Sequence, residues 1–379
     1  MDFSFTAEQE RIREAIAKLC ERFPDDYWLK RDREGGFPED FHQAMARDGW
    51  LGIAMPEAYG GAGLGITEAA VMMQAIAESG AGFSGASAVH MNIFGLNPVV
   101  VFGNPEQKQR WLPPLIAGRE RACFAVTEPN TGLNTKKIKV KAERRDANYI
   151  VSGQKVWIST AQVAEKVLLL ARAEAGITLF YTDLDRKYVE VREIEKMGRH
   201  AVDSNQVFFD ALPVPEVDRI GEEGKGFEYI LHGMNPERIL IAAELVGLGR
   251  CAVKRAAQYA KERVVFDRPI GQNQSIQHPL AANWMALEAA NLMAFKAASL
   301  YDAGKPCGAE ANASKYLAGE ACFEACQQAV MTFGGFGYAR EYHVERYLRE
   351  AFVGRIAPVS RELILCFIAE RVLGLPKSY

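Results

Sequence analysis

Residues 139–159 read KVKAERRDANYIVSGQKVWIS and mark the point where the hydrophobic pattern of this 379-residue chain changes. Apolar and polar residues alternate in this stretch, which is the period of a β-strand with one buried face. Asp146-Ala147-Asn148 supplies turn-forming residues between two alternating runs. The stretch therefore predicts paired strands in the middle of the chain.

Further strand candidates follow without intervening helices, at Lys166–Arg172, Ile177–Tyr181, Val189–Ile194 and Gln206–Phe209. About six short strands at this spacing favour a small antiparallel barrel or sandwich. On either side of them the apolar residues recur at helical spacing. We therefore expect an α+β fold made of an N-terminal helical domain (1–120), a middle β domain (121–227) and a C-terminal four-helix bundle (228–379).

Local signals place the first boundaries. Thr6 precedes the first amphipathic run and is a suitable N-cap residue. Gly60-Gly61-Ala62-Gly63 and Asn104-Pro105 are interpreted as loops because glycine and proline interrupt helices.

Composition limits the class of protein. The formal net charge is -3, so no basic surface for nucleic acid is expected. The seven cysteines form no CxxC pair, and Cys322 and Cys326 have no histidine nearby, so buried reduced thiols are expected rather than a metal site. The N-terminus has no export signal, and no apolar run reaches the ~20 residues of a membrane span. We therefore expect a cytoplasmic protein without a membrane segment.

One motif suggests a nicotinamide dinucleotide site. Gly247-Leu248-Gly249-Arg250-Cys251-Ala252 fits G-x-G-x-x-A and follows an apolar run. That preceding run consists of good helix formers and follows Asn235-Pro236, which is expected to be an N-cap and first helical residue. The glycines are therefore interpreted as close-packing positions inside one helix.

Four stretches together resemble the acyl-CoA dehydrogenase family. They are CFAVTEPNTG with GQKVWIS in residues 123–159, FGNPEQKQRWLPPLIAG (102–118), RVVFDRPIGQNQ (263–274) and FGGFGY through REA (333–351). They occur in the family's order and cover nearly the whole chain. The resemblance implies that the protein binds FAD and dehydrogenates an acyl-CoA thioester to a trans-2-enoyl-CoA. A base would take the Cα proton while hydride passes from Cβ to flavin N5. It also implies an electron-transfer flavoprotein as electron acceptor, a role in fatty acid metabolism, and a homotetramer built as a dimer of dimers.

The resemblance assigns residues to the cofactor. Trp157 would stack on the flavin, with Ile158 beside it and the Ser159 hydroxyl at N5. The pyrimidine edge and the remaining cofactor contacts would involve Phe124, Val126, Thr127, Gly334, Gly335, Ser360 and Glu362. The adenosine diphosphate part of a neighbouring subunit's FAD would be reached by Arg263, Phe266, Asn273 and Gln274. Physically, a flavin needs an aromatic against one face and donors at its edge, and an arginine fork suits a pyrophosphate.

Some positions depart from the family pattern. Leu133, assigned to the substrate site, stands where relatives have a pyrophosphate-binding serine, and Asn134 stands for an aspartate. Met331 replaces a glutamine near the paired glycines. At these points the contacts to the cofactor would come from the backbone alone or would be absent.

The catalytic base is expected at an unusual position. In most relatives it is a glutamate near the C-terminus, where this chain has Pro358. Glu237, in Asn235-Pro236-Glu237-Arg238, aligns with the base of relatives that carry it at the start of a helix. Asn235 and Arg238 would then line the acyl-CoA site. The helix dipole alone also favours a glutamate in a first turn, and Glu362 is the alternative base.

Two other functions remain open from the sequence. One is a relative with altered chemistry, such as a desulfinase-like homologue without proton abstraction at Cα. The other is a non-catalytic acyl-CoA-binding protein. The sequence also does not distinguish a dehydrogenase from an oxidase, because the access of oxygen to the flavin depends on the shape of the cavity.

Overall fold

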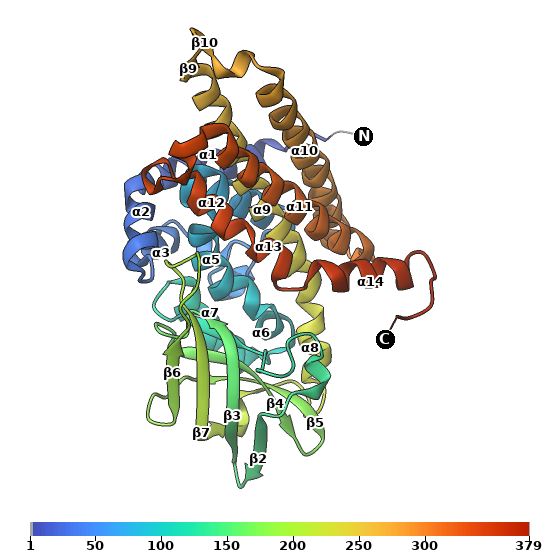
Figure 1. The fold of residues 1–379 in the computed structure, drawn as a ribbon. Helices are drawn as coiled ribbons and strands as arrows, with labels where there is room; N and C mark the ends of the chain where they lie inside the picture. Colours follow the sequence, from blue (N-terminus) through green and yellow to red (C-terminus); the bar gives the residue numbers. More distant parts are fainter. Residues whose placement is uncertain (1–2, 379) are drawn as a thin grey trace.

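A computed structural model describes residues 3–378, with the side chains of residues 92 and 93 outside the description. Helices, then strands, then helices follow one another along the chain, and the sheet lies at one end of the molecule with the C-terminal helices at the other (Figure 1). The expected α, β, α order is confirmed.

The N-terminal part is helical. Its helices are α1 (Ala7–Cys20), α2 (Asp25–Glu34), α3 (Glu39–Arg47), α4 (Ile66–Ile76), α5 (Gly82–Ile93), α6 (Asn97–Phe102) and α7 (Pro105–Ile116). Thr6 caps α1 as expected, accepting a hydrogen bond from the Gln9 amide while the Gln9 side chain accepts from the Thr6 amide. The interruption expected at Asn104-Pro105 lies between α6 and α7, but only Asn104 is outside a helix, because it caps α7 and Pro105 starts it.

The middle part is one sheet. Its strands are β1 (Ala122–Ala125), β2 (Lys141–Arg145), β3 (Asn148–Ser159), β4 (Lys166–Ala173), β5 (Gly176–Asp183), β6 (Val189–Glu193), β7 (Ser204–Pro215) and β8 (Arg219–Ile220). They lie in the order β6-β7-β3-β2-β4-β5-β8, with β1 paired to β4. The sheet is mixed rather than wholly antiparallel, because β1 runs parallel to β4. A parallel pair requires the chain to return to the end of the sheet from which its first strand began. The β2–β3 hairpin lies between β1 and β4 in the chain and provides this return.

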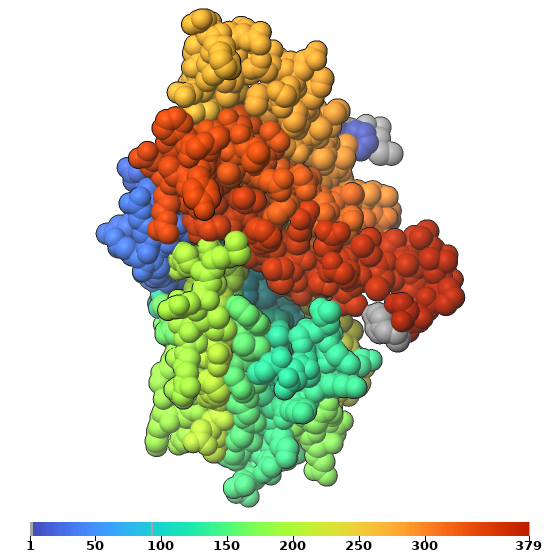
Figure 2. Space-filling view, in the orientation of Figure 1, coloured from blue at the N-terminus to red at the C-terminus, as the bar shows by residue number. Residues whose placement is uncertain are grey.

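The C-terminal part consists of long helices. Its elements are α8 (Gly226–His232), α9 (Met234–Glu262), β9 (Val264–Val265), β10 (Arg268–Pro269), α10 (Gln274–Asp302), α11 (Gly308–Phe333), α12 (Val344–Ala351), α13 (Val353–Ile356) and α14 (Arg361–Arg371). Figure 2 shows the segment from α14 onward projecting from the body of the molecule.

The G-x-G-x-x-A motif lies inside α9, as expected for packing glycines. A Cβ at Gly247 would stand 2.3 Å from the Gln74 carbonyl oxygen of α4, and one at Gly249 would stand 2.5 Å from Leu287 of α10. Helix α9 can therefore approach both neighbours closely. Its start was misplaced by the sequence analysis, since the cap is Gly233 and Asn235 is already helical.

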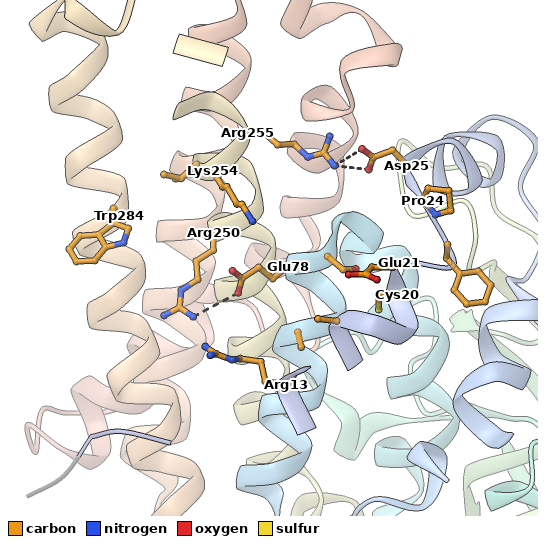
Figure 3. Close-up of a pocket in the computed structure, with 15 residues that line it drawn as sticks. Arg13, Cys20, Glu21, Pro24, Asp25, Glu78, Arg250, Lys254, Arg255 and Trp284 are labelled. Atoms are coloured by element: carbon orange, nitrogen blue, oxygen red, sulfur yellow. Dashed lines mark hydrogen bonds and ion pairs between the residues drawn. The ribbon is translucent and has the colours of Figure 1, made fainter. Parts of the chain in front are cut away.

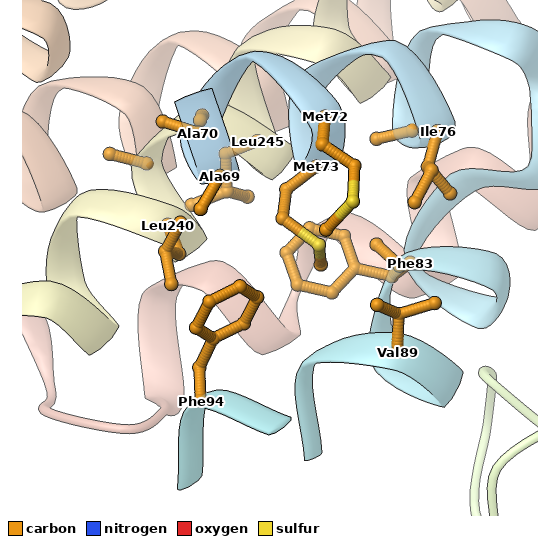
Figure 4. Packing of buried hydrophobic residues seen from close by; sticks show 14 of the residues in the cluster. Ala69, Ala70, Met72, Met73, Ile76, Phe83, Val89, Phe94, Leu240 and Leu245 are labelled. Atoms are coloured by element: carbon orange, nitrogen blue, oxygen red, sulfur yellow. The ribbon is translucent and has the colours of Figure 1, made fainter. Parts of the chain in front are cut away.

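Helices α4, α5 and α9 share an apolar core. Met72, Met73, Phe83, Leu240 and Leu245 are fully buried and face one another across it (Figure 4). The helical run Ile66–Phe102 is long and apolar enough to cross a membrane, yet 62% of its most apolar window is buried inside the protein. Burial in this core accounts for its apolar composition. The seven cysteines are free, and all but Cys366 are buried.

Candidate active site

Trp157 lies at a β-bulge in β3. Its neighbours Val156 and Ile158 pair with Gln206 and Asn205 of β7, so Trp157 is the extra residue of the bulge. Its φ is 61° and its side chain is 59% exposed, although it belongs to a central strand. A bulge redirects a side chain away from the ladder. It leaves a bare indole on the surface of the sheet, available to stack on a planar ligand.

The other residues assigned to the flavin ring lie beside this bulge. The chain leaving β1 runs next to β3, because the Val156 amide donates to the Thr127 carbonyl at 2.9 Å. Val126, Ile158 and Ser159 are buried, whereas Phe124 and Thr127 are half-buried. The structure therefore brings together the residues that we call the ring-side set: Phe124, Val126, Thr127, Trp157, Ile158 and Ser159.

A buried ion pair supports the backbone of this set. Lys155 is fully buried, and its ammonium donates to the Val126 carbonyl at 2.9 Å and to Glu128 at 3.0 Å. Glu128 also accepts hydrogen bonds from the Lys139 and Val140 amides. Loss of hydration lowers the pKa of Lys155 to about 8, although the Glu128 carboxylate opposes that change. The sequence analysis did not single out this pair.

A second group lies around the β9–β10 hairpin and the end of α11. Phe266 and Asp267 form the hairpin tip with positive φ, and Phe266 is 93% exposed. Arg263 stacks over Phe336, 5.4 Å from the ring centroid, and the two line a cavity of about 460 Å³ together with Gly334 and Gly335. No atom lies within 4 Å of where a Cβ would stand at either glycine, so their backbone is open to a ligand.

Asn273 and Gln274 complete this group at the start of α10. Asn273 precedes α10 and accepts a hydrogen bond from Arg268 at 2.7 Å, and Gln274 is exposed. We call Arg263, Phe266, Asn273, Gln274, Gly334 and Gly335 the hairpin-side set. Figure 1 shows β9 and β10 at the opposite end of the molecule from β3. One chain does not bring the two sets together.

Three assigned residues stand apart from both sets. Ser360 caps α14 by accepting from the Leu363 amide at 3.3 Å. Glu362 is 71% exposed and pairs with its neighbour Arg361, and Leu133 is exposed in the loop before β2. Pro358, at the position of the usual base, offers no titratable group. Glu362 therefore has the hydration of a surface carboxylate.

Glu237 occupies a different environment in the first turn of α9. Its side chain keeps some exposure, but protein surrounds the carboxylate and loss of hydration raises its pKa. The charges of His90, Arg238 and Lys315 oppose this rise, and Glu244 adds to it. A carboxylate with a raised pKa is a better base once ionised, which suits the removal of a weakly acidic proton.

Arg238 and Asn235 support the same turn of α9. One Arg238 nitrogen donates to the Met234 carbonyl at 3.2 Å and to the Asn235 side chain at 3.3 Å. The Nε atom of Arg238 is buried without a partner among the described residues. These contacts fix the start of α9 next to Glu237.

Comparison with known proteins identifies the family. Models of the N-terminal, middle and C-terminal domains of acyl-CoA dehydrogenase match residues 6–119, 123–212 and 224–373. The chain is 38% identical over the full length of both proteins to acyl-CoA dehydrogenase fadE12 of Mycobacterium bovis. The chain belongs to the acyl-CoA dehydrogenase family.

Solved structures of acyl-CoA dehydrogenase relatives have the same fold. Butyryl-CoA dehydrogenase from Megasphaera elsdenii superposes with a TM-score of 0.94 at 28% identity, covering 98% of this chain and all of that one. The FAD complex of PigA superposes with a TM-score of 0.94 at 25% identity, covering 99% of this chain and all of that one. Dehydrogenation of acyl-CoA is the general reaction of this family.

The residues of this family member fit a flavin. The exposed indole of Trp157 offers a stacking surface, and Ser159 lies two residues further along β3, while the segment containing Thr127 is hydrogen-bonded to the same strand. The open glycine backbone and the Arg263 guanidinium form a cradle suited to a pyrophosphate.

Sequence reasoning missed three charged residues near this candidate site. His90 of α5 and Glu244 of α9 are both buried, with Nδ1 and Oε1 2.7 Å apart. Burial, the largest single effect, lowers the pKa of His90, but the Glu244 contact and the Glu237 charge together raise it, and the net direction is upward. The His90 charge also acts on Glu237. No local motif marks these residues, since they meet only across the α5–α9 contact.

The third missed residue is Arg199, in the connection from β6 to β7. Its guanidinium donates to Ser159 at 3.0 Å and to Ser87 of α5 at 3.2 Å. Helix α5 therefore contacts Arg199 through Ser87, Arg199 in turn contacts Ser159 of β3, and α5 contacts α9 through His90.

A cavity of about 910 Å³ lies away from both sets, between α1, α9 and α10 (Figure 3). Arg13, Arg250, Lys254 and Arg255 are among its lining residues, and Arg255 pairs with Asp25 across it. None of the residues assigned to the cofactor or the base lines it. This cavity is therefore separate from the candidate active site.

Proposed function

We propose that this chain is an FAD-dependent dehydrogenase that converts an acyl-CoA thioester to a trans-2-enoyl-CoA, with Glu237 as the base. The observation that carries the proposal is the position of Glu237 in the first turn of α9, where loss of hydration raises the pKa of its carboxylate, next to α5, which contacts α9 through His90 and, by way of Arg199, Ser159 of β3. FAD, when bound, would supply the ring that takes the hydrogen and two electrons lost from Cβ.

The chain's own residues accept the proton and position the reacting groups. Glu237 receives the Cα proton, and the loss of hydration that raises the pKa of its carboxylate makes it a better base once ionised. Arg238 and Asn235 hold the first turn of α9, so the carboxylate stays in one place. Trp157 and Ser159 orient the flavin ring in the ring-side set. Holding the reacting groups in this way removes the entropy cost of their encounter.

The absorption spectrum of the purified protein tests the function. We expect bound flavin, or flavin taken up when FAD is added, and bleaching of its visible band by at least one member of a panel of saturated acyl-CoAs. A colourless protein that takes up no FAD contradicts the proposal and favours the non-catalytic acyl-CoA-binding function. Bound flavin without exchange of the Cα proton favours the desulfinase-like alternative.

We also propose a homotetramer built as a dimer of dimers. The hairpin-side set lies far from the ring-side set in one chain, so a second subunit would have to complete each FAD site (Figure 1). Exposed apolar side chains near the C-terminus, Leu365, Val372, Leu373 and Leu375, would be covered by assembly.

Changing Arg263 to glutamine tests this shared site. Loss of a charge-assisted contact to a pyrophosphate typically costs about 1.5–3 kcal/mol, so we expect about 10- to 100-fold weaker FAD binding. Because Arg263 is an exposed side chain at the end of α9, folding should be unaffected. Titration of apoprotein with FAD measures the affinity, and sedimentation measures assembly. A flavin-loaded monomer with wild-type affinity would show that one chain is sufficient.

The proposal also includes an electron acceptor, a cellular compartment and a metabolic role. An electron-transfer flavoprotein would accept the electrons, the cytoplasm would be the compartment, and fatty acid metabolism would be the setting. The net charge of -3 supports a partner that is neither nucleic acid nor an anionic membrane surface. Reoxidation of the substrate-reduced protein by an electron-transfer flavoprotein, compared with reoxidation by oxygen, separates a dehydrogenase from an oxidase.

A further inference from the structure

Arg199 is held beside the end of β3 by hydrogen bonds to serine hydroxyl groups. One terminal nitrogen donates to Ser159 at 3.0 Å and to Ser204 at 3.3 Å, and the other donates to Ser87 at 3.2 Å. These serines belong to β3, β7 and α5, so three elements converge on a single guanidinium. The residue itself has a φ of 58°, a conformation that non-glycine residues adopt only where the surroundings impose it.

No carboxylate balances this cation directly. Within residues 3–378, setting aside the undescribed side chains, no acidic oxygen lies within ion-pair distance of Arg199, and its Nε is buried without a partner. Glu350, Asp203 and Glu244 act on it only through space, and loss of hydration lowers its pKa. Arg199 is only partly buried, but a guanidinium that has lost hydration without a carboxylate partner is stabilised when an anion forms beside it.

We propose that Arg199 is the fixed cation of the flavin site and stabilises the negative charge that two-electron reduction leaves on the flavin ring. The inference rests on the proposed function, which puts the Ser159 hydroxyl at flavin N5. It adds a residue and a role that the family resemblance does not assign.

The charge balance of the reaction explains the need for this cation. The Cα–H bond breaks and its proton goes to the Glu237 carboxylate. The Cβ–H bond breaks and its hydrogen goes to the flavin with two electrons, while the Cα=Cβ bond forms. One negative charge thus moves from Glu237 to the ring. A preorganised cation where charge develops lowers the barrier without any reorganisation of the site.

The reduction potential of the flavin-loaded protein tests the proposal. Equilibration with a reference dye gives the ratio of reduced to oxidised flavin at a fixed potential. We expect Arg199→Gln to lower this ratio about tenfold, which is about 30 mV for a two-electron couple. Arg192→Gln is the matched control, since Arg192 lies on β6 with an exposed side chain paired to Glu190. It should leave the potential unchanged.

A second variant keeps Arg199 in place. Ser87→Asp would put a carboxylate where the Ser87 hydroxyl now accepts from the Arg199 guanidinium. This carboxylate should neutralise the charge of Arg199. We expect its potential to fall like that of Arg199→Gln, whereas the neutral Ser87→Asn should stay close to wild type. If Arg199→Gln does not retain flavin, the reduction potential of Ser87→Asp tests whether the charge of Arg199 stabilises the reduced flavin.

The possible outcomes separate this inference from the proposed function. A wild-type protein that binds no flavin overturns the proposed function. Wild-type potentials in Arg199→Gln and Ser87→Asp, with flavin bound, overturn the role of Arg199 alone. If Arg199→Gln keeps its potential but loses activity only toward acyl-CoAs with a terminal carboxylate, the guanidinium binds the substrate and the inference is wrong.

Discussion

Glu237→Gln should bind flavin normally and reduce it far more slowly than the wild type when an acyl-CoA is added. The amide keeps the size of the side chain but cannot accept the Cα proton. General-base loss typically costs ~10²–10⁴-fold, and a sole base should lie at the upper end. Pro358 leaves the usual base position without a carboxylate, so no second group should rescue the variant. Stopped-flow bleaching of the flavin measures the rate.

Glu228→Gln is the matched control, because Glu228 is an exposed glutamate in the first turn of the preceding helix. It should reduce flavin at the wild-type rate. Since loss of hydration raises the pKa of Glu237, the acid limb of the wild-type rate profile should lie above the ordinary glutamate value of about 4.3. Near wild-type reduction by Glu237→Gln would show that another residue is the base, and Glu362 would be tested next.

Lys155→Met should destabilise the β domain by about 3–5 kcal/mol, because it leaves the Glu128 carboxylate buried without its partner. The Val126 carbonyl also loses its donor, so the ring-side backbone should loosen and flavin affinity should fall with stability. Urea unfolding of the apoprotein measures the first effect, and flavin titration measures the second.

Two variants control this experiment. Lys141→Met removes an exposed lysine from β2 and should change stability by no more than about 0.5 kcal/mol. The double variant Lys155→Met with Glu128→Gln removes both charges and should recover part of the loss. A single Lys155→Met variant as stable as Lys141→Met would show that the pair contributes nothing to the fold.

The alternating pattern around residues 139–159 was sufficient to predict the β domain, because alternation depends only on which face of a strand is buried. It could not predict the direction of β1. That strand pairs with β4, about 40 residues later in the chain, and parallel pairing follows from the path of the chain rather than from local residues. Local capping signals were similarly uneven, correct at Thr6 and misplaced at Asn235.

The sequence by itself determined the order of the domains, the family resemblance and the identity of Glu237 as the candidate base, since each depends on residue type and spacing. Only the tertiary structure decided what surrounds those residues. The bulge that turns Trp157 outward, the His90–Glu244 contact and the three serines around Arg199 all join elements distant in sequence. The dehydration of Glu237 likewise comes from packed neighbours. Hydration and charge at a site are set by groups that meet only on folding, so no local pattern in the sequence records them.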